Sequence, residues 1–342
     1  MSDSAPRLRV MQSFGKPLPT TNPYITMLDE ALANTDGLEH LRFSWTGALF
    51  GRYDAFQWHW PEAKMHGTNW WKSAGRVLLV ALISLRHSLS RRIAVVRTVH
   101  NVELPEDTPL RVWLLRRIER QADYRIVLNT TTPLPQNAPH ALIRHGHYRD
   151  WYSKFPVAER ITGRLATFGG VRRYKAVNTL VDAYAEAVRA EPILSLHIGG
   201  KPSSSQLADD LRQRTASLPN VRLQLAFLTD AELVELATSA ELVVLAYKFM
   251  HNSGSVLAAL SMDRPVLAPR NEVNELLAQE VGEQWVQMYD GELSGQALLD
   301  GWRAASTATG TPDLSLREWA DAGAAHLRAF RAALTAKRRG QR

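Results

Sequence analysis

Residues 164–190 read RLATFGGVRRYKAVNTLVDAYAEAVRA, and this stretch decides the fold class. The run from Arg164 to Phe168 is short and apolar, as in a buried strand, whereas Val177 to Ala190 repeats apolar residues at helical spacing. Two glycines followed by cations lie between them. A strand, a glycine loop and a helix in this order begin a βαβ unit, which predicts a parallel α/β sheet.

The same alternation extends in both directions along the chain. Downstream, strands are predicted at 194–198, 221–225, 242–245 and 265–268, with helices at 204–216, 231–239 (capped by Asp230) and 253–262. Upstream, strands are predicted at 8–14, 54–58, 92–99 and 124–128, with a basic helix at 110–121. Residues 150–163 have little periodicity and separate the two series.

We therefore predict an α/β protein of two doubly wound, Rossmann-like domains. The expected domains are 1–155 and 156–315, followed by a C-terminal helix and basic tail at 316–342. Because ligands sit at the carboxyl ends of parallel strands, two such domains in tandem suggest a cleft between them.

Composition narrows the function. None of the 342 residues is cysteine, which excludes disulfides, thiolate metal sites and cysteine nucleophiles. The net charge of +7 is uneven: residues 51–175 carry +12 and residues 176–300 carry −9. The basic half suits a polyanion or an anionic surface, or is a plain solvated face. No secretory signal is evident, and the most apolar run, Val77 to Leu85, is shorter than the ~20 residues of a membrane span, so we expect a cytoplasmic or peripheral protein.

Two loops in the second half suit phosphate. One opens the helix expected at residue 253 with small and hydroxyl residues, and the other places cations after two glycines. The candidate residues are Asn252, Ser253, Gly254 and Ser255 in the first loop, and Gly169, Gly170, Arg172, Arg173 and Lys175 in the second. The alternatives are a simple serine N-cap and a solvated loop. Neither a Walker loop nor a Gly-x-Gly-x-x-Gly motif follows a first strand, which disfavours ATPases and ordinary dinucleotide binding.

Polar residues also follow two predicted strands of the first half. His59 and Glu62 follow one strand, and His100 and Asn101 follow the next; they could bind an acceptor or act as general base, or serve as caps. His145 and His147 have no third ligand at a metal spacing, so no metal site is predicted.

Trp70, Trp71, Lys72 and Arg76 lead into an apolar helix that ends near Leu89. Aromatic and basic residues that flank an apolar helix suit a membrane interface, and a buried domain helix is the alternative.

Together, Thr98 to Asn101, the 169–175 loop, Asn252 to Ser255 and the Arg264-Pro265-Val266 turn resemble the GT-B glycosyltransferases. The opening segments 13–15 and 20–24 more narrowly resemble bacterial exopolysaccharide mannosyltransferases, the xanthan-type GDP-mannose:glycolipid 4-β-D-mannosyltransferases. The resemblance implies that a nucleotide sugar binds mainly the C-terminal domain and the acceptor the N-terminal one, with Thr21, Asn22, His59 and Asn101 as cleft residues. It also implies no metal cofactor, because cations and a helix N-terminus stabilise the departing diphosphate.

The sequence departs from many retaining GT-B enzymes, which carry a Glu-x7-Glu pattern before the Arg-Pro-Val turn. The two positions fall at Met250 and Ala258. This departure favours an inverting mechanism, which needs a general base. The candidates are Glu62, His100, Glu103 and Asp107, of which Glu62 and His100 lie nearest their predicted strand ends.

The leading hypothesis is a mannosyltransferase that extends a polyprenyl-diphosphate-linked oligosaccharide for exopolysaccharide, on the inner face of the cell membrane. Its expected partners are GDP-mannose, the lipid-linked acceptor and an anionic membrane surface. UDP-glucose or another donor is the alternative within the class. Outside it stand a catalytically inactive binding module and a nucleic-acid-binding protein, the latter disfavoured because no nucleic-acid motif appears.

Overall fold

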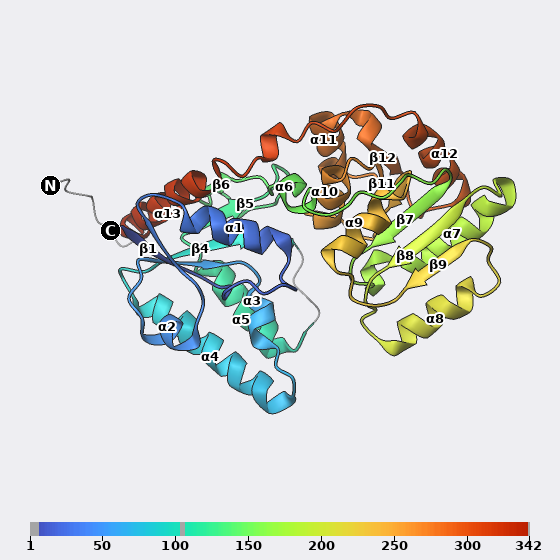
Figure 1. Cartoon of the computed structure of the whole chain (residues 1–342). Coiled ribbons are helices and arrows are strands. Elements are labelled where there is room, and N and C mark those ends of the chain that lie inside the picture. The colour runs from blue at the N-terminus through green and yellow to red at the C-terminus, as the bar shows by residue number, and fades with distance from the viewer. Residues whose placement is uncertain (1–6, 103–106, 341–342) are drawn as a thin grey trace. The chain divides into compact units, whose positions relative to one another are not determined.

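The computed structural model describes residues 7–102 and 107–340, which form two compact units (Figure 1). Unit 1 spans Met1–Gly146 together with Arg317–Arg342, and unit 2 spans His147–Leu316. The division therefore falls nine residues before the expected boundary. Residues 147–155 join unit 2 because the Tyr148 N–H donates to Ser261 Oγ at 2.8 Å and Arg149 pairs with Asp263 at 2.8 Å.

Unit 1 is built on a parallel sheet of six strands in the order β2-β1-β3-β4-β5-β6. The strands are β1 Leu8–Gln12, β2 Leu38–Leu41, β3 Ala55–Trp58, β4 Ala94–Val99, β5 Tyr124–Val127 and β6 His140–Leu142. The order reverses between β1 and β3, where Gln12 and Gln57 are register partners. A reversal of this kind is the topological switch point at which α/β sheets bind ligands.

Helices cover both faces of this sheet. They are α1 Pro23–Ala33, α2 Trp45–Phe50, α3 Pro61–Met65, α4 Trp70–Leu89, α5 Pro109–Arg120 and, from the C-terminal segment, α13 Ala322–Arg339. On one face, Val80 and Ile83 of α4 and Leu114 of α5 pack on Phe56 and Trp58. On the other, α13 lies beside α1 and packs on β3, β4 and β5.

Unit 2 repeats the design with the strand order β12-β11-β10-β7-β8-β9, again all parallel. The strands are β7 Arg164–Phe168, β8 Ser195–Gly199, β9 Val221–Gln224, β10 Leu242–Val244, β11 Val266–Pro269 and β12 Val286–Tyr289. The helices are α6 Arg149–Tyr152, α7 Val177–Ala190, α8 Ser205–Thr215, α9 Asp230–Thr238, α10 Gly254–Ser261, α11 Glu272–Val281 and α12 Gly295–Ser306. The switch point of this sheet lies between β7 and β10.

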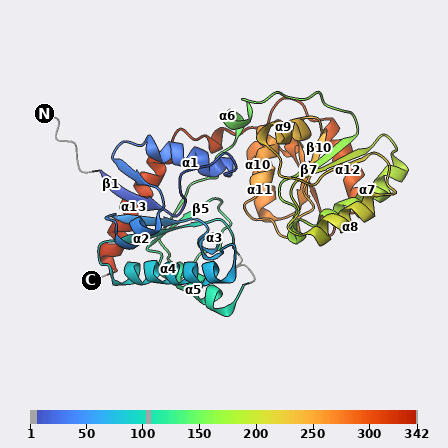
Figure 2. The same ribbon diagram turned by 60° about the horizontal axis from the view of Figure 1, so that its bottom comes forward.

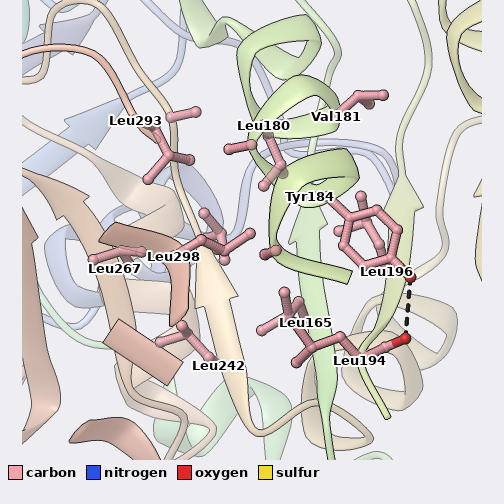
Figure 3. Close-up of a cluster of buried hydrophobic side chains, with 14 of the residues drawn as sticks. Leu165, Leu180, Val181, Tyr184, Leu194, Leu196, Leu242, Leu267, Leu293 and Leu298 are labelled. Carbon is pink, nitrogen blue, oxygen red and sulfur yellow. Dashed lines mark hydrogen bonds between the residues drawn. The ribbon is translucent and has the colours of Figure 1, made fainter. Parts of the chain in front are cut away.

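The core of unit 2 lies between the sheet and the helices α7 and α12. Figure 3 shows Leu180 and Tyr184 of α7 and Leu298 of α12 meeting Leu165 and Leu196 of the sheet. The Tyr184 hydroxyl donates to the carbonyl oxygens of Leu194, at 3.1 Å, and of Pro219, at 2.8 Å, so its one polar atom is satisfied inside the core.

The predicted bounds of β7 and α7 match the structure residue for residue, and most other predicted elements agree within two residues. The helix cap at Asp230 was wrong. Thr229 is the N-cap: its hydroxyl accepts from the Glu232 N–H, and the Glu232 carboxylate accepts from the Thr229 N–H, which forms a capping box.

Candidate functional site

The loops after β7 and β10 leave the sheet of unit 2 at its switch point. The β7 loop begins at Gly169, whose φ of +90° favours glycine. It is joined to the β8 loop at Gly200, where a Cβ atom would lie only 1.9 Å from the Gly169 carbonyl oxygen. The two backbones can come this close because Gly200 has no side chain.

The absent side chain of Gly169 leaves a space that polar groups border. A Cβ atom there would lie 3.1 Å from Lys175 Nζ and 3.8 Å from Ser255 Oγ. Lys175 Nζ stands 5.0 Å from the centre of the Tyr247 ring, and the Tyr247 hydroxyl donates to Ser255 Oγ at 3.0 Å. The Lys248 N–H donates to the Tyr174 carbonyl oxygen at 2.9 Å, which joins the β7 and β10 loops.

The electrostatics of this point favour an anion. Burial lowers the pKa of Lys175, so a bound anion would stabilise its charged form. Ser253 caps α10, accepting from the Val256 N–H at 3.3 Å, and the helix begins at Gly254 with Ser255 in its first turn. A cation, a hydroxyl and a helix N-terminus that converge on a glycine loop suit a diphosphate.

The basic residues of the β7 loop divide between two places. Lys175 turns toward Ser255, whereas Arg172 and Arg173 are exposed and line, with Lys248, a cavity of about 470 Å³ at the beginnings of α7 and α8. Arg172 also approaches the glycine pair, since its Nε lies 3.7 Å from where a Cβ of Gly170 would be.

The positions of the missing acidic pair are part of the core. Met250 and Ala258 are 8% and 4% exposed, respectively. The Met250 carbonyl oxygen accepts from Asn271 Nδ2 at 2.9 Å, which anchors the loop that carries Asn252.

In unit 1, polar side chains gather at the carboxyl ends of β1, β3 and β4. His59 Nε2 lies 3.1 Å from Gln12 Oε1, and His59 Nδ1 lies 3.1 Å from His100 Nε2. The His59 N–H donates to Ser13 Oγ at 2.9 Å. The structure thus brings two sequence-predicted residues, His59 and His100, into contact at the switch point of the unit 1 sheet.

Aromatic rings and one arginine hold this group in place. Trp60 stacks on His100 with ring centres 3.8 Å apart, and Tyr24 meets His100 edge-on at 5.5 Å. The Arg97 guanidinium donates to the carbonyl oxygens of His59 and of Thr98, the latter at 2.7 Å, and so ties together the ends of β3 and β4.

The candidate bases differ in environment. Burial holds the pKa of His59 and of His100 well below the usual value, so both rings are neutral at physiological pH. Burial raises the pKa of Asp107, but hydrogen bonds from the Thr108 N–H and from Arg111 outweigh it and lower that pKa overall. Glu62 lies half-buried in the first turn of α3, and Glu103 lies outside the described residues.

The structure shows only local contacts or exposure for the other expected cleft residues, which are Thr21, Asn22 and Asn101. Asn22 is the N-cap of α1 and accepts from the Tyr24 N–H at 3.0 Å, while Thr21 Oγ1 accepts from the Leu18 N–H at 2.8 Å. Asn101 is exposed directly after His100.

Helix α4 exposes an apolar face. Trp70 and Trp71, stacked at 3.5 Å, are 65% and 69% exposed at its beginning, where Lys72 and Arg76 follow. The exposed leucines of the helix are Leu78, Leu82, Leu85 and Leu89. Figure 2 shows α4 on the outside of unit 1, next to α5. Among the described helices, none is long and apolar enough to cross a membrane.

Across residues 7–102 and 107–340, no group of three or more acidic or histidine side chains could hold a metal ion. The sequence-based prediction assigned no role to Gln12, Tyr24, Trp60 or Tyr247. Of these, Gln12 had a visible signal, because it is a polar residue at the end of an apolar strand.

We compared the fold and the sequence with those of known proteins. No family model matches the chain. Sucrose-phosphate synthase from Thermosynechococcus elongatus superposes with a TM-score of 0.59 at 15% identity, over 98% of each chain. Anabaena HepE in complex with UDP and glucose gives a TM-score of 0.59 at 14% identity, again over 98% of each chain. With two Rossmann-like sheets, the chain has the GT-B fold of glycosyltransferases.

Full-length relatives identify the family. Two proteins of Xanthomonas campestris pv. campestris, each described as a GDP-mannose:glycolipid 4-β-D-mannosyltransferase, are 38% identical to this chain over 338 residues, which is 97% of this chain and 94% of each relative. The chain belongs to this family of mannosyltransferases. The predictions of a GT-B fold and of a glycosyltransferase are thereby confirmed.

Proposed function

We propose that this enzyme transfers mannose from GDP-mannose, with inversion, to a polyprenyl-diphosphate-linked oligosaccharide during exopolysaccharide assembly. The observation that carries the proposal is the 38% identity over 97% of the chain to relatives named for that donor and a glycolipid acceptor. A β-linked product from an α-linked sugar nucleotide requires inversion at the anomeric carbon.

We assign the donor diphosphate to the switch point of unit 2. The cation of Lys175, the Ser255 hydroxyl and the first N–H groups of α10 would neutralise the charge that develops as GDP leaves. Arg172 and Arg173, on the same loop, are the second source of positive charge. This set supplies what a divalent cation supplies in other transferases, so we expect no metal cofactor, and turnover should persist in EDTA.

We assign the general base of inversion to His100. Its ring is neutral and held by Trp60 and His59, whereas the carboxylate of Asp107 is engaged by Arg111 at 2.9 Å and by His66 at 3.2 Å. The oxygens of Asp107 are thus engaged by these two side chains, whereas a neutral imidazole has a lone pair that can take the proton. Glu62 remains the second candidate, as in the sequence-based prediction.

We place the enzyme on the inner face of the cell membrane, held there peripherally by unit 1. Unit 1 carries 25 Lys and Arg against 14 Asp and Glu, a net +11, whereas unit 2 carries 16 against 20, a net −4. The exposed apolar face of α4, with Trp70, Trp71, Lys72 and Arg76, fits an anionic lipid surface. Sedimentation with anionic liposomes measures this association.

The activity is tested with the purified chain, radiolabelled GDP-mannose or UDP-glucose, and a glycolipid acceptor from membranes that assemble exopolysaccharide. We expect label in the lipid fraction from GDP-mannose, released by a β-mannosidase and not by an α-mannosidase. The Lys175→Ala variant is the control for a contaminating transferase. Transfer from UDP-glucose alone would replace the proposed donor, and an α-linked product would refute inversion.

A further inference from the structure

Hydrogen bonds link Gln12, His59 and His100 at the switch point of the unit 1 sheet. Gln57 Nε2 donates to Thr98 Oγ1 at 2.8 Å. Within the described part of the chain, Gln57 Oε1 and Gln12 Nε2 are buried and lack a partner. Gln12 is the register partner of Gln57, and its Oε1 lies 3.1 Å from His59 Nε2.

The directions of the hydrogen bonds from Gln12 to His59 and from His59 to His100 determine which ring nitrogen of each histidine carries the proton. An amide oxygen can only accept, so His59 must be protonated on Nε2, which lies 3.1 Å from Gln12 Oε1. A neutral His59 then has its lone pair on Nδ1. This lone pair faces His100 Nε2 at 3.1 Å, so His100 donates from Nε2 and carries its own lone pair on Nδ1.

We propose that Gln12 and His59 are positioning residues, which hold His100 as the tautomer that is protonated on Nε2 and has its lone pair on Nδ1. This inference rests on the proposed function, in which His100 is the general base. Gln12 is fully buried and His59 is 1% exposed, so both act through His100.

The arrangement gives the proton a defined route. The acceptor hydroxyl passes its proton to His100 Nδ1 as its oxygen forms the bond to the anomeric carbon. The bond from that carbon to the diphosphate oxygen breaks, and its electron pair leaves on GDP. His100 can then shift its Nε2 proton toward His59 Nδ1, so the two rings share one positive charge until a proton returns to solvent.

Ionisable groups on several elements act on the two rings and must be considered in any pH profile. Arg97 of β4 affects both rings. The others are His40 of β2 and His326 of α13 for His59, and His145, which follows β6, for His100.

Kinetic measurements on variants of Gln12 test the hydrogen bonds from Gln12 through His59 to His100. Gln12→Leu removes the acceptor, and we expect kcat to fall about 10- to 100-fold with the KM for GDP-mannose unchanged, a part of the 10²–10⁴ that a general base supplies. Gln12→Glu puts a carboxylate beside His59, which should stabilise the protonated pair and move the acid limb of the kcat profile to higher pH by about one unit or more.

Variants of His59 serve if Gln12→Leu fails to fold. His59→Asn keeps an oxygen near the position of Nδ1 that can accept from His100, whereas His59→Phe does not. We expect the asparagine variant to retain several-fold more of kcat than the phenylalanine variant. Equal kcat in both, or an unshifted pH profile in Gln12→Glu, would overturn the proposal.

Nitrogen NMR of the full-length protein with labelled histidine reads the tautomer without any substrate. We expect the His100 signals of a ring protonated on Nε2, and a mixture of tautomers in Gln12→Leu. A wild-type His100 protonated on Nδ1 refutes the positioning role even if mannose is transferred. Conversely, the expected tautomer without transfer from any donor refutes the proposed function and leaves the hydrogen-bond chain intact.

Discussion

At the scale of single residues, we expect the proposed donor site to depend on one cation more than on its neighbours. Lys175 lies at the glycine loop and Ser255, whereas Arg172 and Arg173 of the same loop are exposed. The sequence predicted a basic phosphate loop but not this division, because three cations within four residues look alike until the short helical turn at 173–175 orients them.

Replacing Lys175 with alanine should weaken donor binding strongly. A charge-assisted hydrogen bond contributes about 1.5–3 kcal/mol, so we expect the Kd for GDP-mannose to rise about 10- to 100-fold in titration calorimetry. Arg212→Ala is the matched control, because Arg212 is an exposed cation that pairs with exposed Asp209. An unchanged Kd in Lys175→Ala would remove this residue from the site.

Gly200 is a second residue on which we expect the proposed donor site to depend. A Cβ at this position would overlap the Gly169 carbonyl oxygen, so Gly200→Ala should force the β7 and β8 loops apart. Gly310 also has a positive φ, +78°, but a Cβ there meets nothing within 4 Å. Gly310→Ala therefore measures backbone strain alone, about 1–2 kcal/mol.

We expect Gly200→Ala to lower the free energy of unfolding by about 1–3 kcal/mol beyond the loss in Gly310→Ala, as measured by denaturant titration, because overlap adds to strain. Donor affinity should fall only in Gly200→Ala. Equal stability losses in the two variants would show that the two loops yield freely.

At the scale of elements, a helix or strand could be predicted from the sequence when its own residue spacing defines it, and not when distant contacts do. β7 and α7 follow from their own apolar spacing, and both match the structure. Helix α13 gave no local sign that it belongs to unit 1, because the elements on which it packs, α1, β3, β4 and β5, lie more than 190 positions away in sequence. The candidate site was predictable in the same measure: His59 and His100 stand out at strand ends, but their contact requires the pairing of β3 and β4.

Helix α4 has two apolar faces with different roles. Ile83 is fully buried, whereas its neighbour Leu82 is 42% exposed. Ile83→Ala should therefore reduce the free energy of unfolding by about 2–5 kcal/mol, and Leu82→Ala by less than about 0.5 kcal/mol. This contrast in denaturant titration defines which face belongs to the core.

Substitutions on the exposed face should separate membrane association from folding. We expect the triple variant Trp70→Ser, Trp71→Ser, Leu78→Ser to reduce co-sedimentation with anionic liposomes several-fold, because apolar area and basic charge act together at a lipid surface. Ile193→Ser, an exposed apolar residue of unit 2, is the control. Undiminished sedimentation of the triple variant, with unchanged thermal stability, would assign this face to another partner.

At the scale of the whole molecule, the two units differ in the number of neutral histidines that they bury. In unit 1, burial lowers the pKa of His87 to about 3 and those of His145 and His326 to about 4, and it holds those of His59 and His100 well below the usual value. In unit 2, burial lowers the pKa of His197 to about 4 and also lowers that of His251. Acid should therefore act more strongly on unit 1.

The sign and the pH window follow from these shifts. Between about pH 4 and the unfolded pKa of about 6.5, the unfolded chain binds protons that the folded unit does not, so stability is full above pH 6.5 and is lost as the pH falls. At pH 5, each histidine with a folded pKa near 4 removes about 2 kcal/mol. The summed loss from several such histidines is a large part of the 5–15 kcal/mol by which a typical folded domain is stable.

We therefore expect unit 1 to unfold before unit 2 between pH 6 and pH 4. Amide hydrogen exchange should show protection lost first in β1, β3, β4 and β5, while β7, β8 and β10 stay protected. His326→Leu removes one buried titrating ring on α13 and should move the acid midpoint of unit 1 downward, with His140→Leu, an exposed histidine, as the control. Simultaneous loss of protection in both units, with a midpoint indifferent to His326→Leu, would mean that buried histidines do not set the acid limit of this enzyme.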